Sequence, residues 1–411
     1  MRTTSKWHRF GVLAAFLSLA GCGDILDVEA PGRIADENLN NPNAFDAIVE
    51  GMSADLTGAF DQMTYISPIA AGELFHSGSY DITEEAKGVL KPEDSNGEFN
   101  SMQQARWVAE HGVERLRENM TETRFNQSPL VAQGWLYGAI ANRLLGEMLC
   151  SSTIDGGPEV PNTVHFERAD SLATLAIAQA GRADLPDVAT AAYGIRASAR
   201  AWLGDWAGAV SDAQQVPDDF TWYVPFGSGN APGLDIYFET YDRYEFSVIN
   251  TMFADQEDDP RVPWSVVILA NGDTATGANG GTPMWQQEKY TSEADDVAAT
   301  KGTEMLVLRA EAELEVNGAA GIPAAYALMN QAREQYGMDP LVETATLAEA
   351  WADLHYERSA TTWLEARHLW DARRWFEKGS GDPGYFAFME GRDTCFPIGD
   401  EERRSNPNLS G

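Results

Sequence analysis

The sequence predicts a mostly α-helical protein of tetratricopeptide-like helix pairs, interrupted by one irregular insertion that carries short β segments. Apolar residues recur at three- and four-residue spacing on both sides of the insertion, which is typical of amphipathic helices. Between residues about 221 and 301 the chain is instead rich in Gly, Pro, Asn and aromatic residues, with only brief β-like runs such as SVVIL. Long irregular segments inside a helical chain usually carry function.

The chain begins with a segment typical of export. Arg2, Lys6 and Arg9 precede an apolar stretch at 11–20, whereas a membrane-spanning helix needs roughly 20 apolar residues. The stretch ends in Leu-Ala-Gly-Cys at 19–22, which matches the bacterial lipobox. We therefore expect a lipoprotein signal peptide at 1–21 and a mature chain, 22–411. Its first residue, Cys22, would carry diacylglycerol on the thiol and a further acyl chain such as palmitate. The alternative is an ordinary signal peptide with an incidental cysteine.

The composition excludes some classes of binding partner and suggests one disulfide bond. The net charge of −34 over 411 residues argues against binding to nucleic acid and against electrostatic docking on anionic membrane lipids. The covalent lipid on Cys22 would therefore be the sole attachment of the chain to a membrane. The two remaining cysteines, Cys150 and Cys395, would form a disulfide more readily than two free thiols in an exported protein. Two buried free thiols remain the alternative, because bridging also needs close Cα atoms.

A helical N-terminal part is expected over residues about 36–220. Apolar faces mark helices within 41–60, 101–120, 130–150, 165–182 and 187–220. Trp107 lies at a helical position where core packing is expected. Within 187–220, Ala197, Ala209 and Ala213 would let two helices approach closely around a turn at Gly204-Asp205, as in a tetratricopeptide unit. The units are unevenly spaced, which excludes a continuous solenoid, and small-residue helices can also arise by chance.

A second helical part is expected at about 302–378, followed by an extended tail at 379–411. A helix pair is indicated at 304–337, with VNGAAGIP as its turn. The segment YERSATTWLEARHLWDARRW at 356–375, treated as one helix, concentrates carboxylates, guanidinium groups and tryptophans. At helical spacing these groups are expected to form ion pairs, and the tryptophans to fill gaps between helices, rather than to perform acid-base chemistry.

Several ordered motifs together resemble the SusD/RagB-like nutrient-uptake lipoproteins of the bacterial outer membrane. They are the lipobox with DILDVEAPG, then AFDAIVEGMSADL, DDPRVPW, EMLVLRAEAELEVNG, ERSATTWLEARHLWDARRW and CFPIGDEERRSNPNL, which cover most of the chain. The resemblance implies a body of four tetratricopeptide-type helix pairs capped by a loop-rich ligand-binding part. It also implies an outer-membrane lipoprotein, facing the exterior, that binds glycans or other oligomeric nutrients and delivers them to a SusC-like TonB-dependent transporter. Such proteins perform no chemistry, so no catalytic residue is expected.

Aromatic residues in the insertion are the first candidates for ligand contacts. Indole and phenol rings pack against the C–H faces of sugars, while neighbouring polar groups orient the hydroxyls. The candidates are Trp285, Tyr290, Trp222 and Tyr223, with Asn271, Asp273, Gln286 and Gln287 as polar neighbours; Trp264 is expected to be structural. The alternative is that these aromatic side chains only pin down a long loop.

The early loop PIAAGELFHSGSYDITEE is the second candidate region. In the family that the motifs resemble, this stretch often reaches the ligand pocket, so Glu73, His76, Tyr80 and Asp81 are candidates for its lining. A solvated loop without ligand contacts is the alternative.

Metal and catalytic motifs are weak in this sequence. The six histidines are scattered, and the sequence contains no His-Glu-x-x-His motif, no phosphate-binding Gly-Lys-Ser/Thr loop and no Gly-x-Ser-x-Gly elbow. Calcium could bind the oxygen-rich DSNGE or DQEDD runs, but neither has the twelve-residue loop spacing, so no metal site or cofactor is expected.

Two other functions stay open. A tetratricopeptide adaptor would bind proteins and no small ligand. An α-helical glycoside hydrolase would need two carboxyl groups roughly 5 to 10 Å apart across a cleft, for which the spacing of acidic residues gives no sign.

Overall fold

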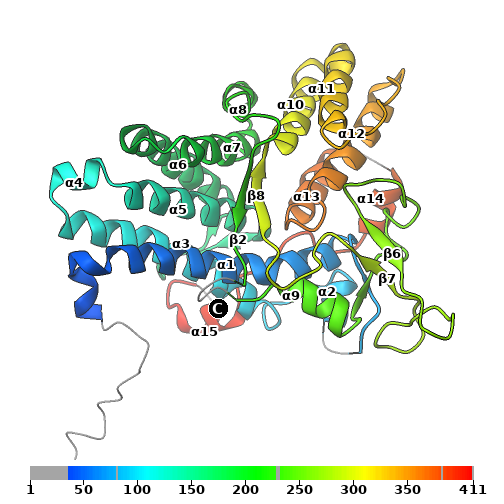
Figure 1. The fold of residues 1–411 in the computed structure, drawn as a ribbon, viewed down its shortest axis with the longest axis horizontal. Helices are drawn as coiled ribbons and strands as arrows, with labels where there is room; N and C mark the ends of the chain where they lie inside the picture. The colour runs from blue at the N-terminus through cyan, green and yellow to red at the C-terminus, as the bar shows by residue number, and fades with distance from the viewer. Residues whose placement is uncertain (1–35, 80–81, 228–231, 381–382, 410–411) are drawn as a thin grey trace, which may run out of the picture.

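A computed structural model describes residues 36–79, 82–227, 232–380 and 383–409, and it confirms the mostly α-helical prediction (Figure 1). Cys22 and the expected signal peptide lie outside the described residues, as do Tyr80 and Asp81. Among the described helices, none is both long and apolar enough to cross a membrane. The helices are α1 (Phe45–Ala70), α2 (Thr83–Ala86), α3 (Asn96–Asn119), α4 (Glu122–Asn126), α5 (Pro129–Met148), α6 (Thr163–Ala183), α7 (Pro186–Trp202), α8 (Trp206–Ala213), α9 (Asp235–Tyr237), α10 (Gly302–Asn317), α11 (Ile322–Glu334), α12 (Leu347–Thr361), α13 (His368–Lys378), α14 (Pro383–Met389) and α15 (Asp400–Ser405).

The helices pack in pairs, as predicted. Contacts run from α1 to α3, α3 to α5, α5 to α6, α6 to α7 and α7 to α8, and a second group joins α10 to α11 and α12 (Figure 1). The predicted small residues Ala197, Ala209 and Ala213 are buried between α7, α8 and α10, which lets these helices approach closely. Gly204 forms the predicted turn, with a φ of +84° that favours glycine.

The strands are short and form antiparallel pairs. They are β1 (Phe75–His76) with β5 (Phe246–Ser247), β2 (Ser151–Ser152) with β3 (Val160–Pro161), β4 (Thr221–Val224) with β8 (Val297–Lys301), and β6 (Trp264–Val266) with β7 (Trp285–Gln287). The β4–β8 pair joins the first and last residues of the irregular insertion, so the insertion leaves and re-enters the helical body at one place. Phe45 of α1 and Trp264 and Tyr290 of the insertion belong to one hydrophobic core, which fixes the insertion to the body.

Two expectations about helices are wrong. The segment 356–375 is two helices, because α12 ends at Thr361 and α13 begins at His368. Between them Leu364 and Ala366 have left-handed backbones, with φ of +57° and +56°. The tail, expected to be extended, contains α14 and α15.

The prediction that Trp107 packs in the core is also wrong. It is 48 % exposed on α3 instead of packed in the core. The buried positions of this helix include Phe99, Met102, Ala105, Ala109, Val113 and Leu116, a stripe at three- and four-residue spacing. Trp107 lies two residues from the nearest members of that stripe, so its side chain points toward solvent.

Cys150 and Cys395 are joined in a disulfide, with Cα atoms 5.0 Å apart. Leu149 and Phe396 form a β-bridge beside it, and the Cys150 amide donates to the Phe396 carbonyl oxygen at 2.9 Å. The link fastens the end of α5 to the C-terminal tail.

Candidate functional site

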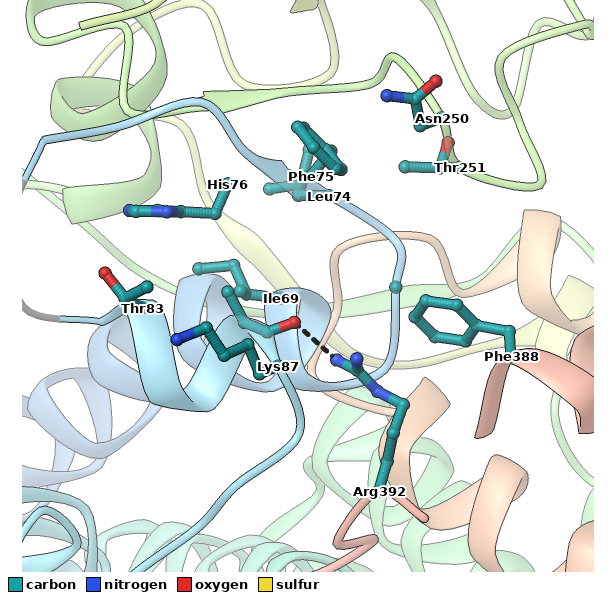
Figure 2. A pocket seen from close by; sticks show the side chains of 12 residues that line it. Ile69, Leu74, Phe75, His76, Thr83, Lys87, Asn250, Thr251, Phe388 and Arg392 are labelled. Atoms are coloured by element: carbon teal, nitrogen blue, oxygen red, sulfur yellow. Dashed lines mark hydrogen bonds between the residues drawn. The ribbon is translucent and has the colours of Figure 1, made fainter. Parts of the chain in front are cut away.

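Three segments far apart in the sequence meet around one open pocket, which we call the loop pocket (Figure 2). They are the stretch from the end of α1 through α2, the loop after β5, and the end of α14 with the turn that follows it. The pocket has a volume of about 440 Å³. It is lined by Ile69, Gly72, Leu74, Phe75, His76, Thr83, Ala86, Lys87, Asn250, Thr251, Phe388 and Arg392.

Two exposed phenylalanines supply the aromatic surface of the loop pocket. Phe75 is 38 % exposed and Phe388 is 43 % exposed, and both side chains are seen at the cavity in Figure 2. Gly72 lets Phe388 take its place, because a Cβ at position 72 would lie 2.5 Å from the Phe388 ring, and its φ of +77° also favours glycine. The backbone at the end of α1 therefore determines where this ring lies.

Arg392 is the principal polar anchor of the pocket wall. Its Nη2 donates to the carbonyl oxygens of Ala70, at 3.1 Å, and Ala86, at 2.7 Å, and its guanidinium lies 4.4 Å from the centre of the Phe388 ring. Burial lowers the pKa of Arg392, but a guanidinium remains charged at neutral pH. Arg392 thus ties the end of α1 and α2 to the tail and supports the aromatic ring.

His76 is the sequence-predicted residue that lines the loop pocket. It lies on β1, with its ring centre 6.0 Å from that of Phe246. Burial lowers the pKa of His76, although the Glu245 carboxylate opposes the shift, so the imidazole is neutral at pH 7. A neutral imidazole can both donate and accept a hydrogen bond.

Glu73 was predicted to reach a ligand, and the structure places it elsewhere. Its side chain is fully buried, and its Oε1 accepts a hydrogen bond from the Leu364 amide at 3.0 Å. Among the described residues its Oε2 has no hydrogen-bond partner, and burial raises the pKa of Glu73 to about 8. The carboxyl group therefore stabilises the left-handed turn between α12 and α13 and is not accessible to a ligand.

Tyr290 holds the same turn from the other side. Its hydroxyl donates to the Leu364 carbonyl oxygen at 3.2 Å. The residue is buried and lines a separate cavity. Two predicted ligand residues thus satisfy the amide and the carbonyl of one residue, Leu364. We call this arrangement of Glu73, Tyr290 and Leu364 the turn clamp.

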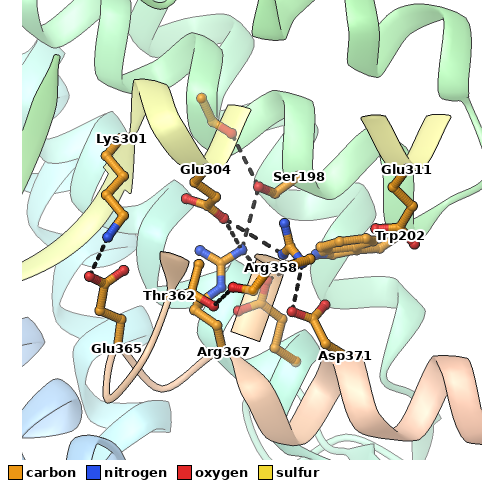
Figure 3. A network of polar contacts seen from close by, with 12 residues as sticks. Ser198, Trp202, Lys301, Glu304, Glu311, Arg358, Thr362, Glu365, Arg367 and Asp371 are labelled. Atoms are coloured by element: carbon orange, nitrogen blue, oxygen red, sulfur yellow. Dashed lines mark hydrogen bonds and ion pairs between the residues drawn. The ribbon is translucent and has the colours of Figure 1, made fainter. Parts of the chain in front are cut away.

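Charged side chains extend the turn clamp into the interior (Figure 3). Lys289 and Lys301 both donate to Glu365 Oε1, at 2.7 and 2.5 Å. Burial lowers the pKa of Lys289 to about 8, whereas the two lysines hold the pKa of Glu365 below its ordinary value against the effect of burial. The residues that follow Leu364 are therefore fixed by ion pairs.

The same network continues along α12 and α13. It confirms that this segment forms ion pairs, although most of the partners lie on other elements and not at helical spacing. Arg367 pairs with Glu304 at 2.7 Å and with Glu147 at 3.1 Å. Figure 3 shows Arg358, whose Nε donates to Asp371 at 2.7 Å, among the buried charges between these helices. Four guanidinium groups compensate four carboxylates there, namely those of Arg143, Arg358, Arg367 and Arg374 and those of Glu147, Glu304, Glu311 and Asp371.

The tryptophans of the insertion do not form an open platform. Trp285 stacks on Trp264 with ring centres 4.6 Å apart and planes 6° apart, so one face of Trp285 is covered. Trp264 is structural, as expected, and donates to the Phe253 carbonyl oxygen at 3.0 Å. Trp285 is not among the described residues that line the loop pocket.

The other aromatic candidates lie on β4. Trp222 is half-buried against the core, which makes it a packing residue. Tyr223 is 52 % exposed and lines a separate cavity of about 530 Å³ with Tyr290 and the two lysines of the network. Of the polar neighbours, Gln286 and Gln287 are buried, while Asn271 and Asp273 lie exposed at a loop tip.

Sequence reasoning missed most of the pocket wall. Phe75 lies inside the early loop that was singled out, directly before the candidate His76, and as an aromatic residue of that loop it could have been included. Asn250, Phe388 and Arg392 had no such signal, because they come from a loop and from a tail expected to be extended. In the described part of the chain, no group of three or more His, Cys, Asp and Glu side chains is placed to hold a metal ion.

A family model and several solved structures are similar to this chain. A model of the SusD family matches residues 228–400, which include most of the insertion and the second helical group. No curated protein sequence matches the chain. Several solved structures do match, at sequence identities that show the fold alone.

Three of these structures illustrate the likeness. A SusD superfamily protein from Bacteroides fragilis has a TM-score of 0.67 and 12 % identity, covering 90 % of this chain and 98 % of the other. A SusD/RagB family protein from Bacteroides thetaiotaomicron has a TM-score of 0.63 and 12 % identity, covering 88 % and 94 %. Surface glycan-binding protein A from Bacteroides uniformis has a TM-score of 0.62 and 13 % identity, covering 88 % and 98 %. The SusD-family match over residues 228–400 and the SusD-like fold shared over about nine-tenths of the chain agree with the family that the sequence motifs resemble.

Proposed function

We propose that this protein is a surface-exposed outer-membrane lipoprotein that binds an oligomeric glycan in the loop pocket and delivers it to a SusC-like TonB-dependent transporter. The observation that carries the proposal is the loop pocket, where the early loop, the insertion and the tail of a SusD-like fold bring two exposed aromatic rings together with polar groups. The glycan-binding neighbour from Bacteroides uniformis supports the same class of ligand.

The chemistry of the pocket suits a sugar. Phe75 and Phe388 offer ring faces for C–H groups, and His76, Asn250 and Thr251 offer hydrogen-bonding groups for hydroxyls. The pocket is open to solvent and has a volume of about 440 Å³, so it would hold a few sugar rings of a longer chain. A long glycan could therefore extend beyond it on both sides.

The lipid anchor and the transporter belong to the same proposal. Cys22 would carry the diacylglycerol and acyl chains that attach the body to the outer membrane, since one acyl chain alone binds only marginally. Mass spectrometry of the mature N-terminus tests the modification, and Cys22→Ser should move the protein from the membrane to the soluble fraction. Co-purification of a large outer-membrane barrel tests the transporter; isolation of the native lipoprotein without one contradicts it.

Glycan arrays test the binding function directly. We expect the wild-type protein to bind at least one oligosaccharide class, and Phe388→Ala to lower that affinity by roughly tenfold or more because it removes a ring face from the pocket. The matched control is Phe376→Ala, which removes a comparably exposed phenylalanine from outside the pocket and should leave binding unchanged. Equal losses in both variants contradict the assignment of the site.

The lining also bears on the two alternatives. None of the described residues that line the loop pocket is Asp or Glu, which supports a binding protein over a glycoside hydrolase with two carboxyl groups. Release of sugars from the bound oligosaccharide on incubation would favour the hydrolase. A tetratricopeptide adaptor would bind no glycan, and so would leave the array blank.

A further inference from the structure

A second cavity lies on another part of the molecule, between α3, the turn after Cys150 and α15. We call it the amide groove. Its volume is about 510 Å³, and it shares no described lining residue with the loop pocket. It is lined by Phe99, Asn100, Gln103, Gln104, Arg106, Trp107, Thr153, Asp155, Gly156 and Glu402. Figure 1 shows α15 well apart from α14, which contributes to the loop pocket.

Trp107 forms a fixed aromatic surface at this groove. Its indole stacks on the His111 ring, with ring centres 4.3 Å apart and planes 22° apart. His111 is held in turn by a 3.0 Å hydrogen bond between its Nδ1 and the Trp107 carbonyl oxygen. One indole face is thus supported by His111, while 48 % of the residue stays exposed. The other indole face is therefore held in a fixed orientation at the groove, where a ligand ring can stack on it.

The side chains of Asn100 and Gln104, beside Trp107, are held by hydrogen bonds that their amide nitrogen atoms donate. Gln104 Nε2 donates to Asp55 at 2.7 Å, and Asn100 Nδ2 donates to Glu401 at 3.1 Å. Among the described residues nothing donates to the side-chain oxygens of Asn100 and Gln104, so both oxygens can accept hydrogen bonds from hydroxyl groups. Side chains that are already fixed lose little entropy when a ligand binds.

Covalent and hydrogen-bonded links hold the two remaining walls together. The Cys150–Cys395 disulfide joins the segments from which the turn and α15 extend. Thr153 Oγ1 donates to Glu402 at 2.8 Å, and Asn408 Nδ2 donates to the Gly156 carbonyl oxygen at 2.8 Å. The groove is therefore a built concavity and not a gap between independent loops.

The charges of the groove select against acidic ligands. Arg106 is the cationic side chain among the lining residues, and it is already occupied by Asp155 at 2.7 Å, Gln103 at 2.9 Å and Glu110 at 3.2 Å. Asp155 and Glu402 leave the groove with an excess of negative charge, as does the chain, at −34. Anionic sugars and phosphates would be repelled.

We infer that the amide groove is a second carbohydrate site, which binds a neutral oligosaccharide with one sugar ring stacked on Trp107. Hydroxyl groups of that sugar donate to the amide oxygens of Asn100 and Gln104. A peptide would need apolar anchor pockets or a free strand edge, but Trp107 is the exposed apolar side chain in the lining and the other wall residues are polar or buried. The inference goes beyond the proposed function, which concerns the loop pocket. Two separated sites would let one long glycan bind with higher avidity than either site alone.

The test compares single-site variants on a glycan array that carries neutral and acidic oligosaccharides, followed by calorimetry with each neutral hit. Trp107→Ala should lower affinity for at least one neutral oligosaccharide by roughly tenfold, and Trp107→Phe should restore part of it. Phe388→Ala, in the loop pocket, should leave a residual binding event that Trp107→Ala removes. Phe376→Ala is the control for loss of an exposed ring, and unchanged melting temperatures verify folding.

Fluorine NMR supplies a site-specific readout. In protein labelled with 5-fluorotryptophan, the Trp107 resonance is assigned as the one missing from Trp107→Phe. It should shift on addition of the neutral hit, and it should still shift in Phe388→Ala.

Each outcome bears on one site or on both. Glycan binding that depends on Phe388 alone, with an unmoved Trp107 resonance, overturns the second site and leaves the proposed function standing. An array with no bound glycan overturns both. Binding of acidic oligosaccharides or of a peptide at Trp107 overturns the assignment of neutral sugar to this groove.

Discussion

The loop pocket and the turn clamp share one short segment, residues 72–76, but are built by opposite physical means. Residues 72–76 contribute Phe75 and His76 to the open pocket and Glu73 to the buried clamp, one facing a ligand space and the other the interior. The pocket has few internal bonds and exposes aromatic area. The clamp is buried, polar and closely hydrogen bonded.

The difference separates stability from binding within one short stretch of chain. Buried charges that are paired contribute little net stability, yet removing one partner is costly because it leaves the other without compensation. Removal of an exposed aromatic ring has little effect on stability, because the ring makes few contacts within the fold. Variants of the two regions should therefore divide into those that lower stability and those that lower affinity.

The largest effect is expected from Arg374→Met, which breaks the buried network behind the clamp. The Arg374 Nη2 bonds to Glu311 and Asp371, at 2.7 and 2.8 Å, would be lost. Among the described residues, the Trp375 indole would be the remaining donor to the buried Glu311 carboxylate. We expect the free energy of unfolding to fall by about 3–5 kcal/mol, measured by chemical denaturation.

The neighbouring arginine provides the matched control. Arg373→Met makes the same chemical change one residue earlier on α13. The Arg373 side chain is 18 % exposed and donates to the Leu149 carbonyl oxygen at 3.3 Å, but its ion-pair partner Glu377 is 64 % exposed and stays solvated when the arginine is removed. No buried charge is left without a partner, so the loss should be well below that of Arg374→Met. If the two variants unfold at the same denaturant concentration, the charges of the network are not the source of its stability.

A second, pH-dependent effect is expected at Glu73. Its pKa is about 8 in the folded protein and 4.5 is its ordinary value, so between these pH values the folded state holds a proton that the unfolded state has lost. This group therefore makes stability fall as pH rises from about 4.5 to 8, by on the order of a few kcal/mol.

Glu73→Gln keeps an acceptor for the Leu364 amide and removes the titration. The variant should gain stability relative to the wild type as pH rises from 5 to 9, as measured by melting temperature at each pH. Parallel curves for the two proteins would show that the Glu73 carboxyl is not held protonated by its burial.

A third effect joins the two regions at Gly72, where the end of α1 meets the pocket. Gly72→Ala would place a methyl group 2.5 Å from the Phe388 ring and hold an alanine at a φ of +77°. We expect a loss of about 1–2 kcal/mol in stability together with weaker glycan binding, because the ring must leave its position.

Gly280→Ala separates the clash from the backbone strain. Gly280 has a φ of +74° and nothing within 4 Å of its Cβ position. It should lose about 1 kcal/mol of stability and none of the affinity. Weakened binding in both variants would mean that the Phe388 contact is not what Gly72 provides.

How far the sequence predicted these two regions depends on what kind of interaction builds them. Helix pairs such as α7–α8 follow from local periodicity and small residues. The charge spacing of 356–378 accounts for the pairs Asp371–Arg374 and Arg373–Glu377, but most ion-pair partners of this segment lie on other elements. The partners of Glu73 and Tyr290 lie 291 and 74 residues away, so no local pattern revealed that both bind Leu364. Nor could the sequence show that Phe388 of the tail would reach Gly72 at the end of α1.

The smallest effect tests the corrected role of Tyr290. If Tyr290 belongs to the turn clamp, Tyr290→Phe removes one buried hydrogen bond, from its hydroxyl to the Leu364 carbonyl oxygen, and leaves the ring in place. Stability should fall by about 1 kcal/mol, since the carbonyl is left without that donor while its backbone keeps a left-handed conformation. Affinity for the glycan should not change. If the variant has wild-type stability but binds the glycan more weakly, Tyr290 contacts the ligand as first predicted. The turn clamp and the loop pocket would then not be separate in function at this residue.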